Sequence, residues 1–89
     1  MMIQLKYHPN LYLGKSILTK NLVKIKRVLE KHPLRSNVFL ITKAYNGIDE
    51  LEIFSAHLLF QSYYQKNPPY IIGITGYYEE ALEVVEQIV

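Results

Sequence analysis

The residues whose types and spacing could do chemistry lie in two glycine-containing turns. Gly14-Lys15-Ser16 follows a short strand-like stretch and precedes a helix-like one, as the end of a phosphate-binding loop does. That motif also needs a glycine five residues before Gly14, and this position is Pro9, so a cradle of backbone amides would not form in the same way. We therefore interpret Ser16 as a helix cap and Lys15 as a solvated side chain.

The second turn, Gly73-Ile74-Thr75-Gly76, ends a short apolar run. Open α/β sheets bind ligands at the carboxyl ends of their strands, and Gly76 would permit a close backbone approach to an anion. A turn that needs a positive φ explains the same glycines. If the site exists, it would hold a small anionic ligand or nucleotide, and the residues expected along its edge are Lys15, Ser16, Lys43, Asn46, Thr75, Gly76 and Tyr77.

Other chemistries have no visible carrier in the sequence. Without cysteine there is no thiol nucleophile and no thiolate zinc site. His8, His32 and His57 are far apart in the sequence, with no acid at ligand spacing, so we predict no metal site. The acids near the C-terminus read as a solvated helix face rather than a catalytic pair. We predict no catalytic residue and no cofactor.

Charge is divided between the two halves of the chain. Residues 1–44 hold nine Lys or Arg against Glu30, a net charge of +8, whereas residues 45–89 hold Lys66 against seven acids, a net charge of −6. This asymmetry predicts an intramolecular match, a self-complementary dimer or an anionic partner. The residues expected to form one basic helix face are Lys20, Lys24, Arg27 and Lys31. This face could follow a nucleic-acid backbone, but it has no interleaved aromatic residue, so we favour a solvated face.

Periodicity places these residues on alternating strands and helices. Residues 3–8 alternate as a strand does, and residues 11–13 resume after a Pro9-Asn10 turn, either as a hairpin or as one bent strand. A helix is expected from Ser16 to about Lys31, followed by a strand over 38–41 that residues 42–45 extend. The final unit is a strand over 70–74 and a helix from Tyr78 onward.

The segment after residue 45 has two interpretations. Asn46-Gly47 is typical of a hairpin turn. We prefer a helix capped by Asn46 and ending near Tyr64, because Asp49 and Glu50 suit a first helical turn and many apolar residues follow. That helix would be apolar over much of its circumference, which indicates burial or an interface. The candidate interface residues are Phe54, His57, Tyr63 and Tyr64.

Together these elements predict one α/β domain over residues 1–89, with the order (β)βαβαβα, a three-stranded mainly parallel sheet and a possible short N-terminal hairpin. So narrow a sheet needs its edges covered by the N-terminal segment or by another subunit, which favours a homodimer. The first residues lack the apolar core of a signal peptide, and no run approaches a membrane span. We expect a soluble, cytoplasmic protein.

Three stretches resemble a family of small uncharacterised bacterial proteins. They are Leu11-Tyr12-Leu13-Gly14, residues 38–41, and residues 73–85, which read GITGYYEEALEVV. The resemblance spans nearly the whole chain and implies a stand-alone bacterial domain, but no activity and no functional residues. From the residues themselves, we expect a module that acts by binding itself or another protein. The alternatives are an anionic ligand near Gly76 and, less favoured, nucleic acid on the basic helix.

Overall fold

The computed structural model describes residues 5–43 and 51–88. Its strands are β1 (Lys6–Leu13), β2 (Phe39–Lys43), β3 (Leu51–Ser55) and β4 (Tyr70–Thr75). The α-helices are α1 (Leu22–Lys31), α2 (Ser62–Lys66) and α3 (Tyr78–Ile88). Three short 3-10 helices connect them, η1 (Thr19–Asn21), η2 (Pro33–Arg35) and η3 (Ala56–Phe60).

The four strands form one mixed sheet in the order β1-β4-β2-β3. β1 is parallel to β4, while β2 is antiparallel to both of its neighbours, β4 and β3. The α/β class predicted from the sequence is confirmed. The predicted three-stranded parallel sheet is wrong, because a fourth strand forms after residue 50 and β2 runs opposite to the rest.

The fourth strand replaces the first part of the predicted second helix. Leu51–Ser55 pairs with β2 in a continuous antiparallel register that includes Leu40 with Phe54 and Ile41 with Ile53. Within the span of the predicted second helix, helical structure is confined to η3 and α2. The helix preferred for Leu51–Ser55 is therefore wrong, and β2 and β3 pair as antiparallel neighbours, as the strands of a hairpin do. Asn46 and Gly47 themselves lie outside the described residues.

The N-terminal segment is one bent strand rather than a hairpin. Tyr7 pairs with Ile71 of β4, but the next registered pair is Tyr12 with Gly73, so the register shifts around Pro9. Proline has no N–H to donate, which accounts for the interruption. The helix expected from Ser16 begins later, at Leu22 after the turn of η1. Ser16 does not cap it, because its side chain is hydrogen-bonded to Glu80 and Gly76.

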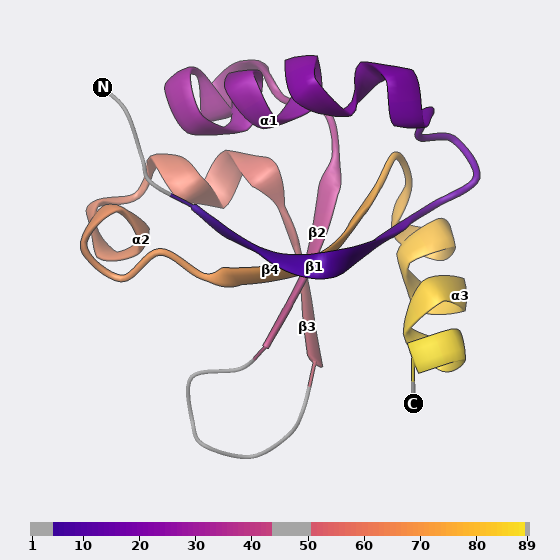
Figure 1. Ribbon diagram of the computed structural model, residues 1–89. Helices are drawn as coiled ribbons and strands as arrows, with labels where there is room; N and C mark the ends of the chain where they lie inside the picture. The colour runs from indigo at the N-terminus through magenta and orange to yellow at the C-terminus, as the bar shows by residue number, and fades with distance from the viewer. Residues whose placement is uncertain (1–4, 44–50, 89) are drawn as a thin grey trace.

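Alternation along the strands directs side chains to two separate cores, one on each face of the sheet. Leu40 and Ile71 pack with Leu29 of α1, whereas Ile41 packs with Ala81 and Val84 of α3. The helices therefore lie in outer layers, α1 with η3 on one face and α3 on the other, as Figure 1 shows with α1 above the strands and α3 at the lower right. Within the described ranges, no helix has the length and apolar content to cross a membrane.

Leu29 tests the core on the α1 side. It is fully buried, whereas Val23 on the same helix is 71% exposed. We expect Leu29→Ala to lower the free energy of unfolding by about 2–5 kcal/mol, because it removes buried methyl groups and leaves a cavity. Val23→Ala should change it by less than about 0.5 kcal/mol. Urea unfolding followed by circular dichroism measures both, and equal costs would contradict this packing.

Candidate functional site

The carboxyl ends of β1 and β4 lie side by side at one end of the sheet, since these strands are parallel neighbours; we call this the carboxyl-end edge. The Gly14 N–H donates to the Ile74 carbonyl at 3.0 Å, which continues the ladder into the two turns. The edge residues that the fold brings together are Lys15, Ser16, Thr75, Gly76 and Tyr77. Lys43 is the last residue of β2, which runs antiparallel to β4, and it pairs with Leu51. It therefore lies at the opposite end of the strands. Asn46 lies outside the described residues.

The polar centre of this edge is occupied by a carboxylate of the chain itself, that of Glu80 in the first turn of α3. The Ser16 hydroxyl donates to Glu80 Oε1 at 2.8 Å, and the Ser16 N–H lies 3.3 Å from both carboxylate oxygens. The Gly76 N–H donates to Ser16 Oγ at 3.0 Å and lies 3.3 Å from Glu80 Oε1. Amides that an external anion would need therefore already have an acceptor.

Two side chains approach the glycines at this end of the sheet closely. A Cβ added to Gly14 would overlap the Glu80 carboxylate, and one added to Gly76 would overlap Ser16 Oγ. Gly76 does not have a left-handed backbone, so the expectation of a positive φ is wrong. The arrangement ties the start of α3 to the loop before α1, in the manner of a capping carboxylate at a helix N-terminus.

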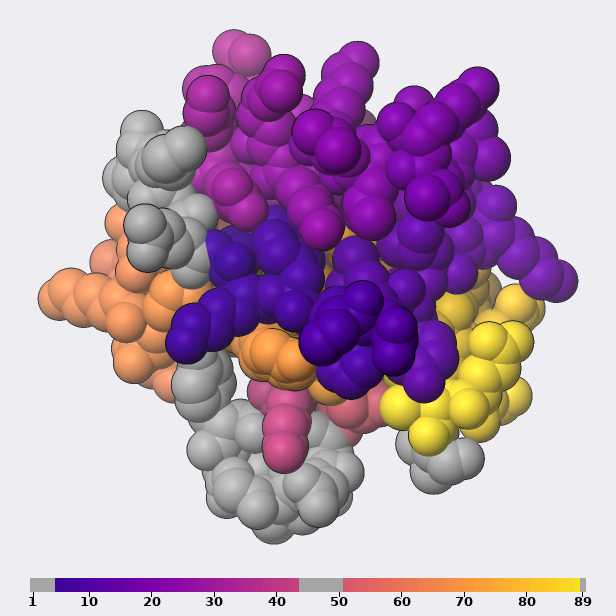
Figure 2. All heavy atoms as spheres, viewed as in Figure 1, coloured from indigo at the N-terminus to yellow at the C-terminus, as the bar shows by residue number. Residues whose placement is uncertain are grey.

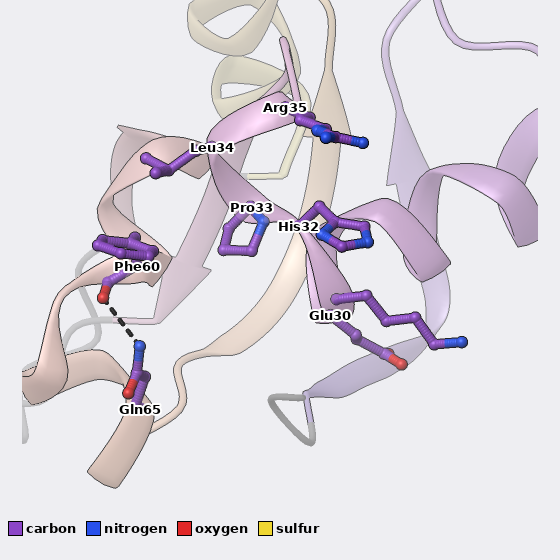
Figure 3. A pocket seen from close by; sticks show the side chains of 8 residues that line it. Glu30, His32, Pro33, Leu34, Arg35, Phe60 and Gln65 are labelled. Carbon is purple, nitrogen blue, oxygen red and sulfur yellow. Dashed lines mark hydrogen bonds between the residues drawn. The ribbon is translucent and has the colours of Figure 1, made fainter. Parts of the chain in front are cut away.

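A second feature is an apolar groove of about 310 Å³ between the end of α1 and the η3–α2 segment. The residues that line it are Glu30, Lys31, His32, Pro33, Leu34, Arg35, Phe60 and Gln65. Figure 3 shows Leu34 and Phe60 on one side and His32 with Glu30 on the other. Leu34 and Phe60 are 56% and 51% exposed, which is unusual for neighbouring large apolar side chains.

Short-range hydrogen bonds build the groove. Pro33 opens η2 directly after α1 ends, and its side chain is buried beneath the groove. The Gln65 side-chain amide donates to the Phe60 carbonyl at 2.8 Å, which fixes α2 against η3 (Figure 3). The exposed apolar residues are therefore held on the folded framework.

The rim of the groove is predominantly cationic. Lys31 and Arg35 are exposed on it, and the one acid, Glu30, accepts a hydrogen bond from the Tyr7 hydroxyl at 2.9 Å. Burial, together with the hydrogen bond and negative charge of Glu30, raises the pKa of the Tyr7 hydroxyl well above its ordinary value of 10.0. Lys26 Nζ lies 4.5 Å from the centroid of the Tyr7 ring, adding a cation–π contact.

A second hollow of about 180 Å³ adjoins the groove, because Arg35 lines both. We call it the side hollow; its other lining residues are Lys24, Ile25, Val28, Ser36, Asn37 and Val38. Lys24 belongs to the predicted basic face, and all four residues of that face are exposed, namely Lys20, Lys24, Arg27 and Lys31. The groove, the side hollow and the basic face thus form one continuous surface with apolar recesses and cationic borders.

The residues proposed from the sequence as an interface are divided. Phe54 and Tyr64 stack on each other at 5.3 Å and pack against the core on the α1 side. His57 and Tyr63 are exposed. His57 lies in η3, whose cap it helps to form by donating its N–H to Ser55 Oγ at 3.3 Å.

Sequence reasoning missed the groove, because two 3-10 turns and a five-residue helix have no periodicity that predicts them. It also missed Glu80 as the partner of Ser16. The spacing of Gly76 and Glu80, which puts an acid in the first turn after a glycine, was the available signal. In the described part of the chain, no three His, Asp or Glu side chains are placed to hold a metal ion.

The close fit of Glu80 gives a double-mutant test. Gly14→Ala should destabilise the protein by about 2 kcal/mol, because the new methyl group displaces the carboxylate from its donors. In a Glu80→Ala background the same substitution should cost much less, whereas in a Glu83→Ala background, which changes an exposed residue of the same helix, it should cost the full amount. Urea unfolding of the six proteins measures this, and equal costs in all backgrounds would refute the contact.

The raised pKa of Tyr7 gives a test with pH. In the unfolded chain the Tyr7 phenol loses its proton near pH 10, whereas in the folded chain it keeps the proton to higher pH. The stability that Tyr7 contributes is therefore present below pH 10 and is lost as the pH rises above it. Between about pH 9 and pH 11, wild type should therefore lose more free energy of unfolding than Tyr7→Phe. Tyr77→Phe, at a residue that is 65% exposed, serves as the control and should follow wild type. Parallel curves for wild type and Tyr7→Phe would contradict the assignment.

Comparison with known proteins assigns the chain to no family. No family model, no curated protein and no solved structure matched the chain. The resemblance to small bacterial proteins therefore stays a prediction, and the proposals below rest on the residues and their geometry.

Proposed function

We propose that this protein acts by binding another polypeptide, and that the groove with its side hollow receives an acidic, amphipathic helix. The observation that carries the proposal is the pair of adjoining recesses that share Arg35, with Leu34 and Phe60 exposed in one of them. Apolar grooves of this kind take apolar side chains spaced three or four residues apart on a helix.

The charges of the rim define the partner further. Lys24, Lys31 and Arg35 border the recesses, and the rest of the basic face continues along α1. Acidic residues beside the apolar anchors of a partner would be attracted to this border, which favours encounter and excludes basic helices. Exposed ion pairs alone contribute little, so most of the affinity would come from the apolar contacts with Leu34 and Phe60.

The two alternative functions gain less support. An anion at Gly76 would have to displace the Glu80 carboxylate from the donors of Ser16 and Gly76. For nucleic acid, the exposed aromatic rings that could stack on bases include Tyr12 and Tyr70, which flank His8 at 6.4 Å and 6.2 Å. Strand alternation places Tyr12 and Tyr70 on the face of the sheet opposite α1, so these two rings do not share a surface with the basic face.

Selection from a library of displayed peptides on the immobilised protein tests the proposal. The enriched sequences should be acidic and carry Leu, Phe or Tyr at helical spacing. Their affinity for Leu34→Ser/Phe60→Ser should fall by about tenfold or more, since exposed anchors of an interface contribute roughly 1–2 kcal/mol each.

Val23→Ser is the matched control, because Val23 is an exposed apolar residue of α1 that does not line either recess. It should bind the selected peptides as wild type does. Peptides without acidic or apolar preference, or peptides that bind the double variant equally well, would refute the proposal.

A further inference from the structure

The sheet separates the two charged helices of the chain. The basic face lies on α1, whereas Glu79, Glu83 and Glu86 are exposed on α3, and the two helices pack on opposite faces of the sheet. In Figure 2 the purple atoms of α1 lie along the top and the yellow atoms of α3 at the lower right, with β1 between them. The opposite charges of the two halves therefore do not neutralise each other through contact of these helix faces within one molecule.

The outer side of α3 has the chemistry that the groove selects. Tyr78 and Leu82 are 47% and 45% exposed, and they lie four residues apart, on the same side of the helix. The exposed acids Glu79, Glu83 and Glu86 lie beside them, on the side of the helix turned away from the core. This is an acidic helix with two large, half-exposed apolar side chains, of which Tyr78 also packs edge-to-face against Phe39 at 5.9 Å.

We infer that the occupant of the groove is α3 of a second copy of this chain. The inference rests on the proposed function of the groove and names its partner. Leu82 and Tyr78 would enter the recesses beside Leu34 and Phe60, and the flanking carboxylates would face the cationic border. Charge complementarity selects this occupant, since the groove is bordered by cations and the helix by acids.

The placement of the two surfaces determines the type of assembly. A copy that inserts α3 into a neighbour has its own groove on the other face of its sheet, free for a further copy. The contact is therefore heterologous, and repetition gives an open chain or a ring rather than the closed homodimer expected from the sequence.

Charge reversal on each surface tests the inference. The first variant, Lys31→Glu/Arg35→Glu, makes the groove border acidic, and the second, Glu83→Lys/Glu86→Lys, makes α3 basic. All four residues are exposed, so both variants should fold as wild type does, which circular dichroism checks. Wild type should self-associate with rising concentration at low salt and dissociate as salt screens the charges, measured by sedimentation velocity or light scattering.

Each reversed variant alone should self-associate at least about tenfold more weakly than wild type, because its groove and its α3 then carry charges of the same sign. A one-to-one mixture should recover the association, since each groove again meets a helix of opposite charge. Lys6→Glu/Lys66→Glu is the control, because it changes net charge by the same amount at exposed residues outside both recesses, and it should associate as wild type does.

A mixture that stays monomeric under conditions where wild type associates would overturn the inference, as would a control variant that fails in the same way as the groove variant. Wild type that remains monomeric at high concentration and low salt would also overturn it. The proposed function fails separately: if acidic amphipathic peptides still select the groove while the chain does not self-associate, the groove binds another protein and only the self-partner is wrong.

Discussion

The alternation of side chains along β2 is the constraint on which the rest of the structure depends. Because successive residues of a strand point to opposite faces, Leu40 and Ile41 belong to two different cores, one closed by α1 and the other by α3. A helix on each face is the arrangement that buries both. The same alternation keeps the basic and acidic helices apart, so the division of charge in the sequence becomes a division between two outer layers of the molecule.

The two layers meet at the sheet edge, where Glu80 of α3 accepts from Ser16 in the loop that leads to α1. Gly14 and Gly76 are small where the carboxylate and hydroxyl need room. A turn that resembles an anion-binding loop in sequence is thus used for internal bracing. The hydrogen-bond donors are those that an anion-binding loop would use, but the acceptor here is the Glu80 carboxylate of the same chain rather than a bound anion.

Part of this architecture could be predicted from the sequence. The unit of β4 and α3 was identified almost to its boundaries, because a short apolar run, a glycine turn and a helical period follow one another without ambiguity. The segment from Leu51 to Ser55 was misassigned, since its dense apolar residues satisfy a strand and a helix pattern alike. Strand order and direction depend on contacts distant in sequence, so Lys43 was placed at the wrong edge. The groove could not be predicted, because its residues are assembled by short turns rather than by one periodic element.

Pro9 has a consequence for how copies of this chain can meet. It lies in β1, the strand at one edge of the sheet, and it is exposed at the point where the pairing register shifts. A bent edge that lacks an amide donor is a poor template for another strand, and such interruptions protect β proteins from aggregation through their backbone. Contact at this edge is thus disfavoured at the level of the main chain. Recognition at the β1 edge is left to side chains, whose charge and shape can be selective where a bare row of amides and carbonyls cannot.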